Sequence, residues 1–234
     1  MNWQPSREHY QWLRKQEYKH LDSSLDYCVQ KEGDTLTVLF QESDNAEDWA
    51  SNLNFFPKKF EIFERSKVKV HRGIAEQYMS VRDELFDLVY NSSIKTVYIS
   101  GFSLGCGLVQ LFTYDVLWHI RRDGLAVNVV SFGYDGPRVF CPNKGVKKLM
   151  KDNFTHIKNR CDPVVHVPWK IMPTFFYFRW KPFKLRINWK GLLSGRLTFW
   201  THVGKQVWIG RPWPWPVKHL PEEIEKSLLK KFGR

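Results

Sequence analysis

The apolar residues of this 234-residue chain form short β-type runs separated by longer helical patterns. Residues 35–40, 96–100 and 127–132 are rich in β-branched and aromatic side chains, which predicts buried strands. Between the first two runs, apolar residues recur every three or four positions, as one face of a helix requires: Ile74, Tyr78, Val81, Leu85 and Leu88. The pattern predicts a strand, a helix and a strand in this order.

A second helical pattern begins at Leu104 and continues to about Arg121. Alternation of strands and helices is typical of a parallel sheet with crossover helices. Further strands are predicted at residues 154–157 and 206–209. Residues 220–232 have acidic residues early and basic residues late, which suits a terminal helix. We therefore predict an α/β fold with a mostly parallel central sheet and flanking helices.

The length and composition predict one domain over residues 1–234, with residues 1–30 as an N-terminal helical extension. Residues 1–19 contain no apolar run that could serve as a signal peptide, and no stretch has the roughly 20 apolar residues that span a bilayer. We therefore expect a cytoplasmic protein that associates with a membrane only peripherally. The four cysteines form no C-x-x-C pair, which predicts free thiols and neither a metal site nor a cofactor: Cys28, Cys106, Cys141 and Cys161.

The net charge of +12 is distributed unevenly along the chain. Residues 1–140 contain 16 Lys and Arg against 19 Asp and Glu, whereas residues 141–234 contain 20 against 5. The carboxyl part therefore carries +15 and attracts polyanions. Composition alone does not choose between nucleic acid and an anionic membrane surface.

The segment Gly101-Phe-Ser-Leu-Gly105 matches G-x-S-x-G and lies between a predicted strand and a predicted helix. A nucleophilic serine requires this context, because small flanking residues allow a sharp strand-to-helix turn that exposes the hydroxyl. An ordinary glycine-rich turn or a phosphate loop is the alternative interpretation. Ser103 is thus the candidate nucleophile.

A serine nucleophile needs a general base and an acid that orients the base. Five histidines follow Ser103: His119, His156, His166, His202 and His219. Five aspartates also follow it: Asp115, Asp123, Asp135, Asp152 and Asp162. Asp162 follows the predicted strand at 154–157, and α/β sheets gather their sites at the carboxyl ends of strands. This favours Asp162 over Asp135 by a small margin.

The chain resembles the class 3 lipase family, which includes the fungal triacylglycerol lipases, from about Thr35 to Ile209. The likeness rests on seven segments in register: Phe40-Gln-Glu-Ser43, Asp48-Trp49, Val70-His-Arg-Gly-Ile-Ala-Glu-Gln-Tyr-Met-Ser80, Gly101-Phe-Ser-Leu-Gly-Cys106, Phe132-Gly-Tyr-Asp-Gly-Pro-Arg138, Asp162-Pro-Val-Val-His-Val-Pro168 and His202-Val-Gly-Lys-Gln-Val-Trp208. The departures are Phe102 for the usual His or Tyr, Cys106 for Gly or Ala, and Gln41-Glu42 for Arg-Gly.

The resemblance implies a serine carboxylic ester hydrolase that acts on acylglycerols or phospholipids through an acyl-enzyme, with no cofactor. It implies the triad Ser103, Asp162 and His202. It also implies an oxyanion hole from Ser43 and the backbone N–H of Leu104. A lid helix would lie over the site at roughly residues 44–55, which include Asp48 and Trp49.

Aromatic residues alternate with Lys and Arg between residues 169 and 200. This composition suits a membrane headgroup interface, although it also suits a groove for single-stranded nucleic acid or core strands with solvated charges. Because the segment connects two predicted triad residues, an anionic lipid surface is preferred over nucleic acid as the partner. A catalytically inactive lipase-like module that binds anionic membrane or nucleic acid is the alternative function.

Overall fold

The computed structural model describes the following residues: 4–21, 25–41, 56–62, 67–91, 93–160, 162–168, 170–173, 176–179, 184–187, 197–210 and 221–232. Its helices are α1 (Arg7–Arg14), α3 (Arg72–Val89), α4 (Leu104–Asp123), α5 (Lys144–Met150) and α7 (Pro221–Phe232), with a 3-10 turn η1 (Val164–His166). Its strands are β1 (Lys19–Leu21), β2 (Leu25–Glu32), β3 (Thr35–Gln41), β4 (Pro57–Lys59), β5 (Lys69–His71), β6 (Thr96–Phe102), β7 (Asn128–Tyr134), β8 (Phe154–Asn159), β9 (Ile171–Pro173), β10 (Phe176–Arg179), β11 (Lys184–Ile187), β12 (Leu197–Phe199) and β13 (Lys205–Ile209).

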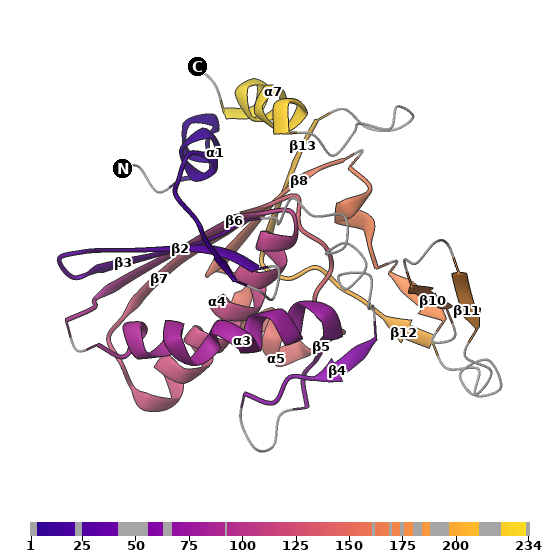
Figure 1. Cartoon of the computed structure of the whole chain (residues 1–234), viewed down its shortest axis with the longest axis horizontal. Helices are drawn as coiled ribbons and strands as arrows, with labels where there is room; N and C mark the ends of the chain where they lie inside the picture. Colours follow the sequence, from indigo (N-terminus) through magenta and orange to yellow (C-terminus); the bar gives the residue numbers. More distant parts are fainter. Residues whose placement is uncertain are drawn as a thin grey trace.

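A seven-stranded sheet in the order β1-β2-β3-β6-β7-β8-β13 forms the centre of the fold. The five strands from β3 to β13 are parallel, whereas β1 and β2 join at one edge as antiparallel strands. The carboxyl ends of the parallel strands lie at one edge of the sheet, opposite the turn that joins β2 to β3 (Figure 1). The predicted mostly parallel sheet with flanking helices is confirmed.

Helices cover both faces of the sheet (Figure 1). On one face α4 packs between α3 and α5, and its buried residues join the larger hydrophobic core. On the other face α1 and α7 pack together over a smaller core that includes Tyr10, Phe102 and Leu228. Burial on both faces explains why β6 is a nearly continuous apolar run rather than an alternating one.

The predicted helices at 74–88 and 104–121 are confirmed as α3 and α4, and the predicted terminal helix as α7. The N-terminal region differs from the predicted helical extension, because α1 is its only helix among the described residues and β1 and β2 join the sheet. Asp26 interrupts the apolar run of β2, which hides the strand in the sequence. This carboxylate is nevertheless buried, and it is paired with the ring of His20 at 2.6 Å.

Short antiparallel ribbons lie beyond the carboxyl edge of the main sheet (Figure 1). They pair β4 with β5, β9 with β12, and β10 with β11. Isolated bridges connect Val70 to Phe140 and Phe140 to Thr201, so the base of the β9/β12 ribbon is attached to β5. None of the described helices is long and apolar enough to cross a membrane. The predicted lid at 44–55 lies outside the described residues.

Candidate active site

Ser103 occupies the single-residue turn between β6 and α4. Its backbone angles are φ 55° and ψ −122°, a conformation that a residue with a side chain rarely adopts. The backbone N–H of Ser103 donates to the carbonyl oxygen of Tyr134 on β7 at 2.9 Å, which holds the strained turn in place. A strained serine between a strand end and a helix start is the geometry of a nucleophile elbow.

The two glycines of the motif are required by close backbone contacts. A Cβ atom on Gly105 would lie 2.4 Å from the carbonyl oxygen of Phe40, and one on Gly101 would lie 2.7 Å from the same oxygen. Helix α4 therefore begins directly against the end of β3, with no room for a side chain between them. The G-x-S-x-G pattern is thus explained by packing as well as by the turn.

The two departures from the family pattern at the elbow are both buried. Phe102 lies on the side of the sheet covered by α1, where its ring contacts Tyr10 edge-on at 5.6 Å between centroids. The sulfur of Cys106 fills the space above Gly133 and Gly136, since a Cβ on either glycine would lie within 2.4 Å of it. Burial also raises the pKa of the Cys106 thiol, so this residue is not a second nucleophile.

Both candidate acids lie at the carboxyl edge of the sheet with Ser103. Asp162 follows β8, is 1% exposed, and accepts a hydrogen bond from the backbone N–H of Val164 at 2.8 Å. Asp135 follows β7, is fully buried with φ 45°, and accepts from the backbone N–H of Asn159. The sheet therefore brings Ser103, Asp135 and Asp162 to the same edge.

His202 is placed differently from the serine and the aspartates, because it precedes β13 rather than following one of the parallel strands of the main sheet. β13 is parallel to β8 and starts with Lys205 beside Thr155, in the amino half of β8. The ring of His202 packs against the ring of His156, with 5.0 Å between centroids. The ring nitrogens of His202 are buried and make no hydrogen bond of normal geometry to Ser103 or Asp162, whereas a contact with the backbone of Val165 favours the protonated ring.

The surroundings of His202 are basic. The pKa of His202 is lowered to about 3, mainly by burial and then by the positive charges of Lys158 and Arg138. Burial, followed by the neighbouring His202, also lowers the pKa of His156. A general base must be able to hold a proton, and these cations oppose the imidazolium form.

Lys158 is the most unusual member of this basic cluster, since it is fully buried. Its ammonium group donates to the side-chain oxygen of Gln206 and lies 4.0 Å from the ring centroid of Trp208. Burial, followed by repulsion from Arg138, lowers the pKa of Lys158 to about 7. This cluster was not among the predicted site residues, although the period-two spacing of His156 and Lys158 on β8 places both on one face.

The other predicted site residues have varied positions. The ring of His119 contacts the backbone oxygen of Asp115 at 2.9 Å on α4, which is a structural role. His166 is exposed, and its ring contacts the backbone oxygen of Arg160 at 3.0 Å. Leu104 is the first residue of α4, where helix amides lack carbonyl partners within the helix. The residues that lie outside the described part of the chain are Ser43, Asp48, Trp49 and His219.

No group of three or more His, Cys, Asp or Glu residues within the described part of the chain could hold a metal ion. The three described cysteines are free thiols: Cys28, Cys106 and Cys141.

The model of the family described as lipase (class 3) matches residues 37–172, which is more than half of the chain. The chain belongs to the class 3 lipase family. The matched stretch includes Ser103 and Asp162 and ends before His202. No curated protein sequence matches the chain.

Solved structures of fungal lipases share the α/β-hydrolase fold of this lipase-family chain. A Rhizomucor miehei lipase is 23% identical with a TM-score of 0.57, and the match covers 83% of this chain and 56% of that one. Lipase II from Rhizopus niveus is 20% identical with a TM-score of 0.52, covering 68% and 63%. A triacylglycerol lipase described as having a serine protease triad is 18% identical with a TM-score of 0.53, covering 83% and 66%. The family member described here thus spans less than two thirds of these lipases.

Proposed function

We propose that this class 3 lipase family member is a serine carboxylic ester hydrolase that acts on lipid esters, either acylglycerols or phospholipids. The observation that carries the proposal is the backbone of Ser103, which holds φ 55° on a turn flanked by two glycines whose close backbone contacts leave no room for a side chain. Backbone strain of this kind costs of order 1–3 kcal/mol and persists mainly at functional sites. The fungal lipase structures support the same class of reaction.

The proposed reaction proceeds through an acyl-enzyme. The Oγ of Ser103 attacks the ester carbonyl carbon and gives its proton to a histidine base. The N–H of Leu104 and a donor from Ser43 stabilise the oxyanion of the tetrahedral intermediate. The alcohol leaves with the proton, and water then hydrolyses the acyl-Ser103 ester to release the carboxylic acid. Asp162 orients the base and stabilises its charged form.

The identity of the base is a separate proposal. The resemblance assigns this role to His202, but burial and the cationic neighbours Lys158 and Arg138 disfavour the charged form that a base must adopt. The last residue of β13, Ile209, lies beside Asn159 on β8, and Asn159 precedes Asp162 by three residues. The segment that follows β13 therefore starts at the edge of the sheet that carries Asp162. His219 follows β13 in sequence. We therefore propose His219 as the favoured base and keep His202 as the alternative.

The proposed partner surface is an anionic membrane, which the +15 charge of residues 141–234 would attract. A second candidate function is a catalytically inactive lipase-like module that binds anionic membrane or nucleic acid. The charge of +15 on residues 141–234, which attracts either polyanion, is the observation that favours it.

The test is hydrolysis of a short p-nitrophenyl ester together with labelling by a fluorophosphonate probe. We expect activity without added metal or cofactor, and labelling at Ser103. Replacing Ser103 by Ala should lower kcat by on the order of 10³-fold or more and abolish labelling. Folded wild-type protein that neither labels nor hydrolyses the ester would instead support the inactive module.

A further inference from the structure

The ribbon of β9 and β12 has one apolar face that is exposed to solvent. Its register pairs Ile171 with Phe199 and Pro173 with Leu197. Residues directly opposite one another, and residues two apart on a strand, lie on the same face. Ile171, Leu197 and Phe199 are 51%, 52% and 48% exposed, so they form one continuous apolar surface. Thr198 on the opposite face is buried, which shows that the ribbon packs by its other side.

The ribbon is firmly attached to the body of the protein. Trp200, the residue after β12, is 1% exposed, and its backbone N–H donates to the carbonyl oxygen of Lys170 at 2.9 Å. Its ring lies 5.9 Å from the ring of His71 at the start of α3, measured between centroids. The backbone N–H of Thr201 donates to the carbonyl oxygen of Phe140 at 2.9 Å. The apolar face is therefore held in a fixed orientation.

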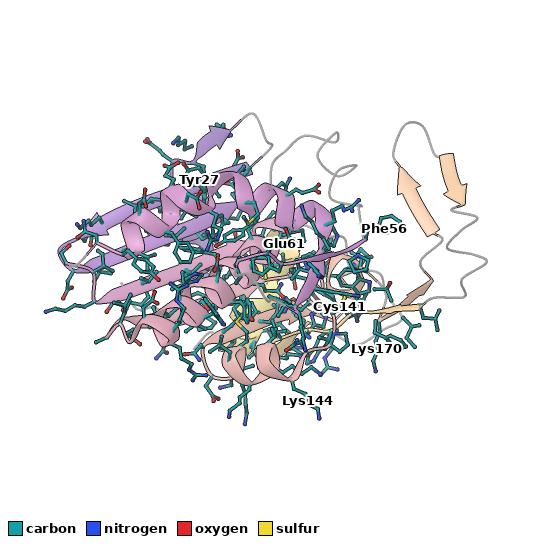
Figure 2. All side chains as sticks on the ribbon, turned by 90° about the horizontal axis from the view of Figure 1, so that it is seen from below. Tyr27, Phe56, Glu61, Cys141, Lys144 and Lys170 are labelled. Carbon is teal, nitrogen blue, oxygen red and sulfur yellow. The ribbon has the colours of Figure 1, made fainter. Side chains whose placement is uncertain are left out.

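Exposed lysines lie around the base of the ribbon. Lys170 directly precedes Ile171, and Figure 2 shows it on the side where the ribbons project. Lys59 and Lys69 are exposed register partners on β4 and β5, which the Phe140 bridges connect to the ribbon. Like charges directly opposite one another destabilise a strand pair, so a partner that neutralises them would be favoured. Glu61, two residues after Lys59, is also exposed, and Glu76 pairs with the neighbouring Lys58 at 3.6 Å.

The apolar ribbon face and the lysines at its base both lie at the edge of the sheet that carries Ser103. Ser103 follows β6 and Asp162 follows β8, and β9 begins nine residues after Asp162. In Figure 1 the ribbons extend beyond the carboxyl ends of the parallel strands, away from the turn between β2 and β3. A surface bound by the ribbon would therefore lie at the catalytic edge.

We propose that the face formed by Ile171, Leu197 and Phe199 inserts into the interface of an anionic lipid bilayer, while Lys59, Lys69 and Lys170 contact the headgroups. Two of the three exposed side chains, Ile171 and Leu197, are aliphatic, so they favour hydrocarbon and do not stack on bases, which favours a bilayer over nucleic acid as the occupant. A second copy is disfavoured because each carboxyl part carries +15. The proposal deepens the proposed function by naming the surface that presents the lipid ester.

The experiment measures flotation of the full chain with vesicles of phosphatidylcholine alone and of an equal mixture of phosphatidylcholine and phosphatidylserine. An Ile171→Gln, Leu197→Gln, Phe199→Gln variant should lose vesicle binding on the order of 100-fold, because three half-exposed side chains no longer enter the interface. A Lys59→Gln, Lys69→Gln, Lys170→Gln variant should lose binding to the anionic vesicles only. The matched control is Leu229→Gln with Phe232→Gln on α7, whose side chains are 47% and 38% exposed and which should leave binding unchanged.

Three results would overturn the proposal: unchanged binding by the apolar variant, an equal loss in the α7 control, or a dimer that dissociates in the apolar variant. If the triple variant unfolds, single Leu197→Gln and Phe199→Gln variants should each reduce binding about fivefold, and unchanged binding in both overturns it. Hydrolysis of the soluble ester separates this proposal from the proposed function. Binding without hydrolysis refutes only the enzyme, and hydrolysis without binding refutes only the docking surface.

Discussion

The turn that carries Ser103 and the loop that carries His202 both come from short motifs, and the structure holds them by different means. The backbone of Ser103 is fixed by its bond to Tyr134 and by two glycines that admit no side chain. The ring of His202 contacts His156 edge-on and makes no hydrogen bond of normal geometry to Ser103 or Asp162. A nucleophile is positioned by local backbone geometry, whereas a base depends on polar partners from distant segments.

Substitution of the proposed triad acid, Asp162, is the sharpest test of the site around Ser103. Asp162→Asn should lower kcat by about 10⁴-fold, because the amide no longer holds the base in its productive tautomer. Asp135→Asn should cost much less, because Asp135 does not orient the base in the proposed triad and an asparagine oxygen can still accept the backbone hydrogen bond from Asn159. Steady-state kinetics on the soluble ester compare the two variants. A larger loss in Asp135→Asn would show that the acid is wrongly assigned.

Two matched substitutions test which histidine is the general base. His219→Gln should lower kcat by on the order of 10³-fold, and His202→Gln should lower it less than about tenfold. The physical reason is that the cations near His202 disfavour the imidazolium that a base must form. Thermal unfolding of both variants checks that the fold is retained. The reverse ranking would restore His202 as the base.

The backbone contacts of the elbow predict a stability effect. Gly105→Ala should lower the free energy of unfolding by roughly 3 kcal/mol, because the new Cβ would overlap the Phe40 carbonyl. Gly124→Ala is the control, since this glycine has φ 66° but nothing within 4 Å of the added atom. Gly124→Ala should lower the free energy of unfolding by about 1 kcal/mol. Urea unfolding measures both, and equal losses would mean that the contact with β3 relaxes freely.

Acid should destabilise the protein through the buried histidine pair. The pKa of His202 is lowered to about 3 and that of His156 is lowered well below its usual value, so the folded state keeps both rings neutral. Below about pH 6.5 only the unfolded chain takes up these protons. The free energy of unfolding then falls by up to about 1.4 kcal/mol per pH unit for each histidine.

Urea unfolding at pH 7 and pH 5 measures this dependence. His202→Asn should reduce the difference in stability between the two pH values, because one of the two buried rings is removed. The same acid sensitivity in the wild type and the variant would assign the effect to other groups.

Much of the sheet and both central helices could be predicted from the sequence, because periods of two and of three to four report burial directly. The elbow was also predictable, since a strand, a serine between glycines and a helix follow one another within a few residues. β2 was missed because Asp26 lies within it, and its burial depends on a partner, His20, six residues earlier in the chain.

The sequence by itself determined which residues could react and where the nucleophile turns, because these properties are local. Only the tertiary structure decided the surroundings of each reactive group. It placed His156 and Lys158 beside His202, fitted Cys106 against Gly133 and Gly136, and exposed the apolar face of β9 and β12. These outcomes depend on contacts between segments that are distant in the chain, and desolvation and charge act through space rather than along the sequence.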